Sequence, residues 1–235
     1  MAPIPGRAWS ETMDLLVINP NSTVAMTEAM VDVARRSAPG FSIEGWTSHD
    51  GPASIQGRAD GERATKPLLT LVDQVKGSGA HGVIIGCFDD TALEEAAARL
   101  TVPVIGIGQA AFHYCAMRNW RFSVVTTLQV SVPVIEGNLR TYGLWDHVGR
   151  VRASDVPVLT LDASPELSTE PILRETLAAA SEDRVDAVVL GCAGMGRVTP
   201  AIRGAAPLPI IDPVEAAATC MAWMIAQSDA LALSA

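Results

Sequence analysis

The chain has 235 residues, of which 49% are hydrophobic, and 26 acidic against 17 basic side chains give it a formal net charge of −9 at pH 7. This length predicts one large domain or two small ones, with enough residues to bury a substantial core. Because phosphates and anionic membranes bind to basic surfaces, the acidic balance argues against nucleic acid and membrane as main partners and favours a small molecule.

Signals for export, membrane insertion and metal binding are missing from the sequence. Its apolar runs fall far short of the roughly 20 residues that cross a bilayer, and the first fourteen residues lack the apolar core of a signal peptide. We therefore expect a cytoplasmic protein. The four cysteines are widely spaced and form no CxxC pair, so we expect reduced thiols. The four histidines show no metal-ligand spacing and are interpreted as surface or structural residues.

Short apolar runs rich in β-branched residues alternate with amphipathic stretches along the chain. In chain order, the predicted strands are residues 15–19, 41–46, 82–86, 102–106, 122–126, 148–153, 187–191 and 209–212. They lack strict alternation, as expected of strands buried on both faces. Helix starts are indicated at Ser22, at Ser131 with Pro in the first turn, at Thr169 with Pro in the first turn, and at Asp212. This alternation predicts an α/β fold with parallel sheets.

An internal repeat suggests that the chain contains two copies of one α/β unit. HGVIIGCFDDTALEEAAARLTVPVIGIGQAA, from His81, aligns with DAVVLGCAGMGRVTPAIRGAAPLPIIDPVEAA, from Asp186, with one residue inserted in the second segment. Cys87 then falls on Cys192. The alternative is that any two βαβ segments resemble each other. The repeat predicts two pseudo-symmetric doubly wound lobes, residues 15–118 and 119–235, after a tail of residues 1–14, with a C-terminal helix able to pack back on the first lobe.

Two such lobes would place their strand ends around a shared crevice, where ligands of open α/β sheets bind. Asn19, Cys87, Thr126, Thr127 and Cys192 lie at predicted strand ends, so two thiols would face one cleft. Acid/base groups on opposite sides of a carbon can invert its configuration without a metal or organic cofactor. Helix N-termini after each cysteine are expected to lower the thiol pKa from about 8.5 towards neutrality. Their N–H groups would also stabilise an oxyanion.

Several short segments together resemble one known family. They are INPNST (18–23), PASIQG (52–57), CFDD (87–90), GIGQAA (106–111), RFSVVTT (121–127), SVPVIE (131–136) and VLGCAGM (189–195). These segments resemble, in family order, the signatures of the hydantoin racemase branch of the Asp/Glu racemase superfamily. The resemblance covers residues 15 to about 225. It implies a homo-oligomeric, cofactor-independent racemase of 5-substituted hydantoins or the ureide allantoin, with Cys87 and Cys192 as the two bases.

The resemblance also implies which residues hold the substrate's carbonyl and ring N–H groups. These are Asn19, Phe88, Asp89, Thr126, Thr127, Ala193 and Gly194. One departure is Pro213 in the segment IDPV, where hydantoin racemases usually have glycine. Proline removes an N–H donor, although it also suits the first turn of a helix. The substrate range is therefore left open by the sequence.

Alternative interpretations remain for several of these residues and for the activity itself. Cys115 and Cys220 lie in Ala-rich helical patterns and are interpreted as packing residues, and Asp89 and Asp90 are also typical helix caps. Among the proposed contacts no arginine is present, which favours a neutral ureide over a dicarboxylic amino acid. Other candidate activities are an Asp/Glu-type amino-acid racemase, a maleate isomerase-like enzyme and an arylmalonate decarboxylase-like enzyme. Outside enzymes, a thiol-based small-molecule sensor fits the two cysteines.

Overall fold

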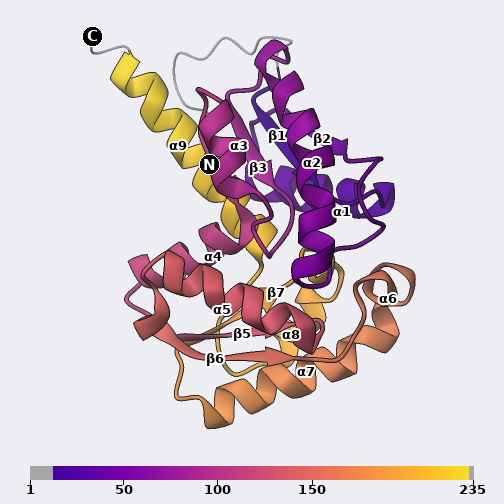
Figure 1. Ribbon diagram of the computed structural model, residues 1–235. Helices are drawn as coiled ribbons and strands as arrows, with labels where there is room; N and C mark the ends of the chain where they lie inside the picture. The colour runs from indigo at the N-terminus through magenta and orange to yellow at the C-terminus, as the bar shows by residue number, and fades with distance from the viewer. Residues whose placement is uncertain (1–12, 233–235) are drawn as a thin grey trace.

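Two four-stranded sheets, all of whose strands are parallel, form the frame of the protein (Figure 1). The computed structural model describes residues 13–232. Each sheet carries helices on its faces and forms one lobe, and the two lobes are built alike. The doubly wound α/β fold with two pseudo-symmetric lobes is thus confirmed.

The first sheet has the strand order β2-β1-β3-β4. Its strands are β1 (Leu15–Asn19), β2 (Ile43–Thr47), β3 (Gly82–Ile85) and β4 (Val104–Gly106), and its helices are α1 (Val24–Ser37), α2 (Arg58–Gln74), α3 (Leu93–Arg99) and α4 (Ile107–Met117), with a short 3-10 turn η1 (Val75–Gly77). Every residue of β1 and β3 is buried. Burial on both faces explains why these strands are continuous apolar runs.

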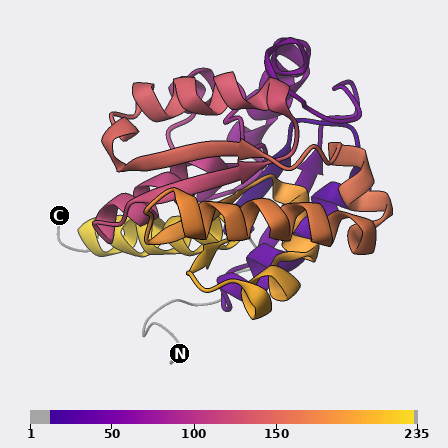
Figure 2. The ribbon, with the colours of Figure 1, turned by 90° about the horizontal axis from the view of Figure 1, so that it is seen from below.

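The second sheet repeats this order as β6-β5-β7-β8. Its strands are β5 (Phe122–Thr126), β6 (Val148–Ala153), β7 (Ala187–Gly191) and β8 (Ile210–Ile211); its helices are α5 (Val132–Thr141), α6 (Val158–Ala163), α7 (Pro165–Glu182), α8 (Thr199–Ala205) and α9 (Pro213–Ala232), with 3-10 turns η2 (Gln129–Ser131), η3 (Trp145–His147) and η4 (Ala193–Arg197). Figure 2 shows α5 and α7 on opposite faces of this sheet. The first and second halves of the chain therefore share one topology.

The predicted strands are all present, and four of them are shorter than expected, β3 by the single residue Gly86. β2 begins at Ile43 instead of residue 41, β4 begins at Val104 instead of residue 102, and β8 has only two residues. Pro103 and Pro209 precede β4 and β8, and proline has no N–H for a sheet ladder. Their carbonyls still accept hydrogen bonds from the neighbouring strands.

Of the four predicted helix starts two are confirmed, one differs by one residue in its cap, and one is wrong. α5 follows Ser131, and α9 follows Asp212, whose Oδ1 accepts the N–H groups of residues 214 and 215. α1 begins after Thr23 rather than Ser22. Thr169 lies inside α7, which already begins at Pro165 because this proline supplies the first-turn conformation. The Thr169 hydroxyl bonds back to the carbonyl one turn earlier instead of capping a new helix.

A shared core joins the lobes. Phe112 of α4 stacks on Phe122 of β5 with ring centroids 5.8 Å apart. Phe88 packs edge-on against the ring of Phe112, with centroids 5.3 Å apart. The C-terminal helix α9 packs against α1, α4 and β3 of the first half of the chain, as Figure 1 shows for the yellow helix. Gly82 of β3 has no room for a side chain because Met221 of α9 lies against it. Between residues 13 and 232, no helix is both long and apolar enough to span a bilayer.

Candidate active site

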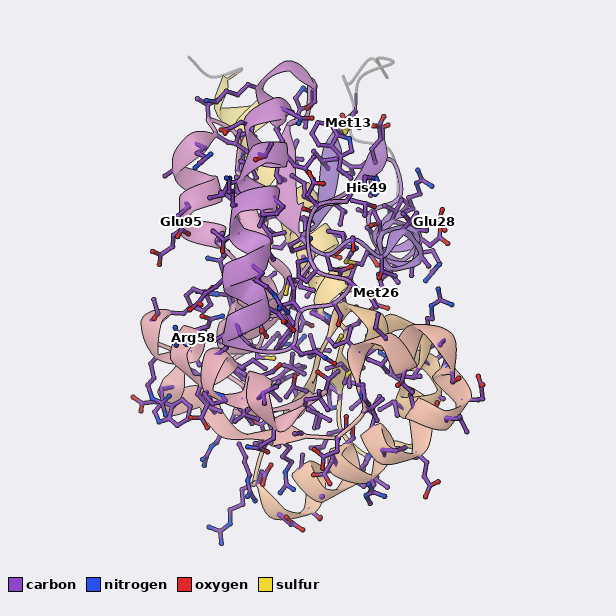
Figure 3. The ribbon with its side chains drawn as sticks, turned by 45° about the vertical axis from the view of Figure 1, so that its right-hand side comes forward. Met13, Met26, Glu28, His49, Arg58 and Glu95 are labelled. Carbon is purple, nitrogen blue, oxygen red and sulfur yellow. The ribbon has the colours of Figure 1, made fainter. Side chains whose placement is uncertain are left out.

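A small cavity of about 40 Å³ lies where the carboxyl ends of β3, β5 and β7 meet. Both lobes line it, with residues Asn21, Met26, Met30, Ile55 and 86–89 from the first and Thr126, Thr127, Ser131, Val158 and 191–194 from the second. Figure 3 shows Met26 near the junction of the two lobes. The volume corresponds to a few water molecules. The cavity is thus a small chamber between the lobes.

Cys87 follows β3, with Gly86 between them, and reaches the chamber from the first lobe. Its Sγ accepts a hydrogen bond from the Thr91 hydroxyl at 3.4 Å. Burial raises the pKa of the Cys87 thiol well above its usual range, the nearby Asp89 carboxylate raises it further, and the Thr91 hydroxyl opposes both. Gly86, just before it, is packed against the sulfur of Met30, so a larger residue there would push into the chamber wall.

Cys192 lies directly after β7 and reaches the chamber from the second lobe. Burial raises the pKa of its thiol to about 11, while the N–H groups of Gly194 and Met195 lower it. The charge of Cys192 is also among the influences that raise the pKa of Cys87, so the two thiols share one electrostatic environment. The expectation that helix N-termini bring the thiol pKa towards neutrality is therefore wrong, because burial outweighs the N–H donors.

Asp89 places a buried carboxylate at the same chamber. Burial raises its pKa to about 7, against a lowering by the N–H group of Gly57. Within residues 13–232, its Oδ2 is buried without a hydrogen-bond partner. Asn138 of α5 donates to the Asp89 carbonyl at 2.8 Å, which fixes the turn from the second lobe. A buried acceptor without a donor is costly unless a ligand supplies one, so Asp89 is suited to accept a ligand N–H.

Asp90, the residue after Asp89, binds the start of α4 and does not line the chamber. Its carboxylate accepts the N–H groups of Gly108 at 3.0 Å and Gln109 at 2.7 Å, and the Tyr142 hydroxyl at 2.9 Å. A side chain at Gly106 or Gly108 would collide with this carboxylate. The GIGQ segment therefore anchors the start of α4 under the turn that follows Cys87. Asp90 is a cap for α4 and does not line the chamber.

Asn19 is buried at the end of β1 but does not line the chamber. Its amide nitrogen lies within hydrogen-bond distance of Asn21 Oδ1 at 3.0 Å, the Thr23 carbonyl at 3.1 Å and Thr27 Oγ1 at 3.0 Å, and its Oδ1 accepts the Asn21 N–H. These bonds shape the turn between β1 and α1. Asn21, held by that turn, lines the chamber instead.

The loop of residues 48–57 brings Ile55 to the chamber. The turn after β1 holds it through the Ser22 N–H to the Pro52 carbonyl at 2.9 Å and the Thr23 hydroxyl to the Ala53 carbonyl at 2.7 Å. These bonds explain why two distant segments of the sequence, INPNST and PASIQG, belong together. Gln56 Oε1 accepts the Val158 N–H at 3.0 Å and so ties the loop to the second lobe.

Of the nine site residues that the sequence predicted, eight line the chamber. They are Cys87, Phe88, Asp89, Thr126, Thr127, Cys192, Ala193 and Gly194. The Thr126 hydroxyl donates to the Gly191 carbonyl at 3.0 Å and so joins β5 to β7. Pro213 begins α9 and is not a chamber residue, so its missing N–H leaves the chamber unchanged.

Sequence reasoning missed several chamber residues. Ile55 and Ser131 lie in segments that the family resemblance already singled out, PASIQG and SVPVIE, and this signal could have indicated them. Met26, Met30 and Val158 carry no such signal, because apolar residues in helices normally pack in the core. Only the approach of the two lobes brings these three side chains to the chamber.

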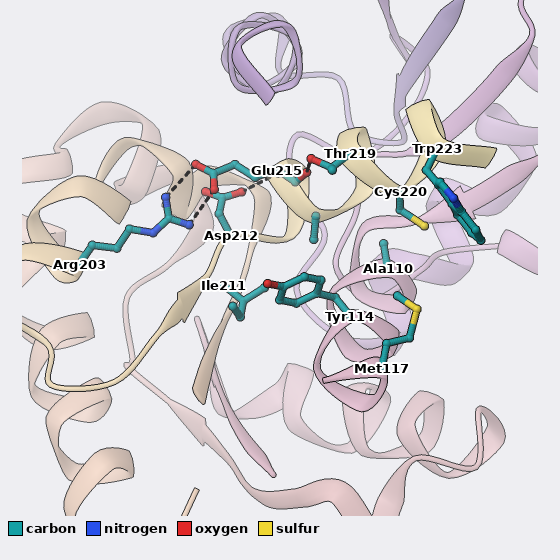
Figure 4. A pocket seen from close by; sticks show the side chains of 11 residues that line it. Ala110, Tyr114, Met117, Arg203, Ile211, Asp212, Glu215, Thr219, Cys220 and Trp223 are labelled. Atoms are coloured by element: carbon teal, nitrogen blue, oxygen red, sulfur yellow. Dashed lines mark hydrogen bonds and ion pairs between the residues drawn. The ribbon is translucent and has the colours of Figure 1, made fainter. Parts of the chain in front are cut away.

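A larger cavity, of about 460 Å³, lies between α4 and α9. Figure 4 shows Met117 and Trp223 at one end of it and the ion pair of Arg203 with Glu215 at the other. Neither Cys87 nor Cys192 lines it. Cys220 faces this cavity and is only half-buried, whereas Cys115 is a core residue as expected. Two thiols and a carboxylate line the smaller chamber, which is therefore the candidate active site.

Comparison with known proteins agrees with this architecture. The family model described as Asp/Glu/Hydantoin racemase matches residues 15–221. The chain belongs to the Asp/Glu/hydantoin racemase family. Curated relatives named hydantoin racemase are 39% identical in Rhizobium meliloti (87% of this chain, 86% of that protein) and 31% identical in Pseudomonas sp. strain NS671 (87% and 82%).

Solved structures extend the comparison within the family. The allantoin racemases of Pseudomonas fluorescens and Klebsiella pneumoniae have TM-scores of 0.86 and 0.85 at 33% and 34% identity, and each match covers 92% of this chain and 92% and 89% of the respective relative. A glutamate racemase from Francisella tularensis, at 14% identity and a TM-score of 0.68, shares the fold. With these relatives, the chain is a racemase and hence an isomerase. Among the described residues, no group of three His, Cys, Asp or Glu side chains is arranged to hold a metal ion.

Proposed function

We propose that this racemase inverts C5 of 5-substituted hydantoins, or of allantoin, by a cofactor-independent transfer of one proton between two cysteines. The supporting observation is that Cys87 and Cys192 follow equivalent strands of the two lobes and line one chamber. One thiolate takes the C5 proton, so the C5–H bond breaks, an S–H bond forms and the electron pair passes into an enolate. The opposite thiol then gives its proton to the other face of C5 and becomes the thiolate.

The chamber suits a neutral ring better than a free amino acid. Among the described residues that line it, Asp89 has the only acidic or basic side chain other than the two thiols. An amino-acid carboxylate would need a cationic partner there. A hydantoin ring instead offers N–H donors and carbonyl acceptors. The free Oδ2 of Asp89 would accept a ring N–H, and the Thr127 hydroxyl and the main-chain N–H groups of Phe88, Ala193 and Gly194 would bind the ring carbonyls and the enolate.

The test compares wild type with Cys87→Ser and Cys192→Ser on both enantiomers of several 5-substituted hydantoins and allantoin in D₂O. Optical rotation reports inversion, and proton NMR reports exchange at C5. We expect each single variant to lose inversion and to keep exchange with only one enantiomer, because each face of C5 then has one functional base. Cys220→Ser, outside the chamber, should behave like wild type.

Two results would contradict this proposal. Inversion at the wild-type rate by either serine variant would remove that cysteine from the mechanism. A wild type that neither inverts nor exchanges any of these compounds would rule out a cyclic ureide substrate, and amino acids and dicarboxylates would be the next candidates. Binding without turnover would instead favour a sensor.

Two further proposals concern the protein in the cell, the first from the family resemblance and the second from the composition of the sequence. We propose that it is a homo-oligomer, so light scattering should give a mass that is a multiple of the 24.7 kDa of one chain. We also propose that it acts in the cytoplasm, on a small molecule and without nucleic acid or membrane partners. A mass of one chain at micromolar concentration would contradict the first of these.

A further inference from the structure

Two apolar residues from equivalent segments of the two lobes form one wall of the chamber. Ile55 lies in the segment after β2, and Val158 follows β6, the strand that corresponds to β2 in the second lobe. Both side chains are buried, and both line the chamber. The hydrogen bond from the Val158 N–H to Gln56 Oε1, 3.0 Å long, joins the two segments across the lobes. This wall lies outside the sheets.

The geometry of a two-base reaction determines where the C5 substituent must lie. In the enolate, C5 is planar, and its substituent lies in the ring plane while the two thiols face the opposite sides of that plane. The substituent therefore occupies nearly the same place for both enantiomers, between the lobes. The polar edges of the ring require Asp89 and the N–H groups at the strand ends. The side left for the substituent is formed by the segments outside the sheets, where Ile55 and Val158 line the chamber.

The apolar side chains of this wall favour an apolar C5 substituent over a polar one. Ile55 and Val158 offer no hydrogen-bonding side chain, and the Gln56 Oε1 is already used by the Val158 N–H. An aliphatic or benzyl-type substituent gains by leaving water for such a wall. The ureido arm of allantoin would lose its hydrogen bonds to water there without replacement.

We infer that Ile55 and Val158 bind the C5 substituent and make the enzyme selective for hydantoins with an apolar substituent over allantoin. This inference rests on the proposed function. The chamber has space for a few waters only, so the wall must move outward when such a substrate enters. Both wall residues lie on segments outside the strands that carry the cysteines, so this movement does not require the cysteines to move.

The test is the substitution Val158→Thr, which keeps the shape of the side chain and replaces a methyl by a hydroxyl. We expect kcat/KM for 5-isobutylhydantoin to fall about three- to tenfold, and kcat/KM for allantoin to stay the same or rise. The enantiomers have equal free energies, so kcat/KM must be equal in both directions and one enantiomer of each compound suffices. The matched control is Val130→Thr, whose side chain is 58% exposed and which does not line the chamber; it should change neither value.

A binding measurement separates this inference from the proposed function. Calorimetry with a Cys87→Ser/Cys192→Ser protein compares 5-isobutylhydantoin and allantoin, with and without Val158→Thr, and requires no turnover. Tighter binding of 5-isobutylhydantoin that Val158→Thr weakens would support the wall even if no racemisation occurred. The inference is overturned if wild type prefers allantoin, if Val158→Thr changes both compounds by the same factor, or if neither compound binds.

Discussion

The two cysteines of the chamber are not stabilised in the same way. The Cys87 Sγ has the Thr91 hydroxyl as a donor, whereas Gly196 occupies the corresponding place after Cys192. Cys192 instead has main-chain N–H groups in η4 that lower its thiol pKa. The duplicated lobes have thus kept two thiols but support them with different donors. A side-chain donor can be removed by substitution, so the two thiols can be tested separately.

Thr91→Val should slow reactions of the Cys87 thiolate and leave Cys192 unaffected. Burial already raises the pKa of Cys87, and loss of the hydroxyl donor removes an interaction that opposes this rise. A hydrogen bond to a charged group contributes about 1.5–3 kcal/mol, so the rate of alkylation at pH 8 should fall at least about tenfold. The measurement is iodoacetamide labelling of Cys87 in a Cys192→Ser background across pH, followed by peptide mass spectrometry.

The control for this experiment is the same substitution in a Cys87→Ser background, where Cys192 is labelled instead. Its rate should not change. Equal slowing of both thiols would mean that Thr91 acts through the general shape of the chamber and not through its bond to Cys87.

At the residue scale, the sequence predicted which residues line the chamber better than it predicted their hydrogen bonds and pKa values. The repeat and the family segments indicated Cys87 and Cys192, and both line the chamber. Asn19 was expected at the ligand, but its amide is engaged in the turn, and Asn21 lines the chamber. The direction of the thiol pKa was wrong because desolvation depends on how closely the opposite lobe approaches. A single sequence contains no direct signal of that distance.

At the element scale, the turn after Cys87 is held by contacts with α4 and α5. Asp90 and Ala92 have positive φ values of 48° and 50°, a conformation that non-glycine residues adopt at a cost. The cost is offset by the bonds of Asp90 to the start of α4 and to Tyr142. The turn therefore depends on close packing between the Asp90 carboxylate and the glycines of GIGQ.

Gly106→Ala should destabilise the protein, and Gly137→Ala should stabilise it. A methyl group at Gly106 collides with the Asp90 carboxylate, so the carboxylate must move and leave buried donors without an acceptor. We expect a loss of about 2 kcal/mol or more in the free energy of unfolding. Gly137 lies within α5 with open space around it, where alanine should add up to about 1 kcal/mol. Urea denaturation of both variants gives the comparison, and equal effects would refute the role of Asp90 as an anchor.

The sequence predicted a helix boundary correctly where a local capping residue determines it. It missed the boundary where tertiary packing determines how far the helix extends. Asp212 before Pro213 gives a true cap, because its carboxylate accepts two N–H groups of α9. Thr169 and Pro171 look the same in sequence but lie within α7. The helix continues through them because it packs against β5, β6 and β7 over most of its length. Such packing can override the local preference of a proline for the first turn.

At the scale of the whole molecule, the repeat predicted two lobes but could not predict how they are joined. The shared core around Phe112 and the packing of α9 against first-lobe helices fix the lobes relative to each other. Tyr142 and Asn138 of α5 also bind the turn after Cys87. The chamber is thus a property of the whole chain. Its small volume depends on contacts between residues far apart in sequence, which periodicity does not report.

The two buried carboxylates of this interface should make stability depend on pH. Burial raises the pKa of both Asp89 and Asp90 to about 7, against 3.8 for an ordinary aspartate. Below about pH 4 both states hold these protons. Between about pH 4 and 7 the unfolded chain has lost them while the folded protein keeps them. The unfolded state then binds fewer protons, so the free energy of unfolding should fall as pH rises through this range and level off above it.

Asp89→Asn tests this relation because it removes one of the two titrations and keeps the size of the side chain. A pKa difference of one unit corresponds to about 1.4 kcal/mol, so the fall in the free energy of unfolding between pH 5 and pH 7.5 should be smaller than in wild type by about 2 kcal/mol. The measurement is urea denaturation at four or five pH values on both proteins. The net charge of −9 also favours unfolding as pH rises, but it acts on both proteins almost equally. Parallel curves for the two proteins would show that Asp89 is ionised in the folded protein throughout this range, and its free Oδ2 would then meet the ligand as a full negative charge.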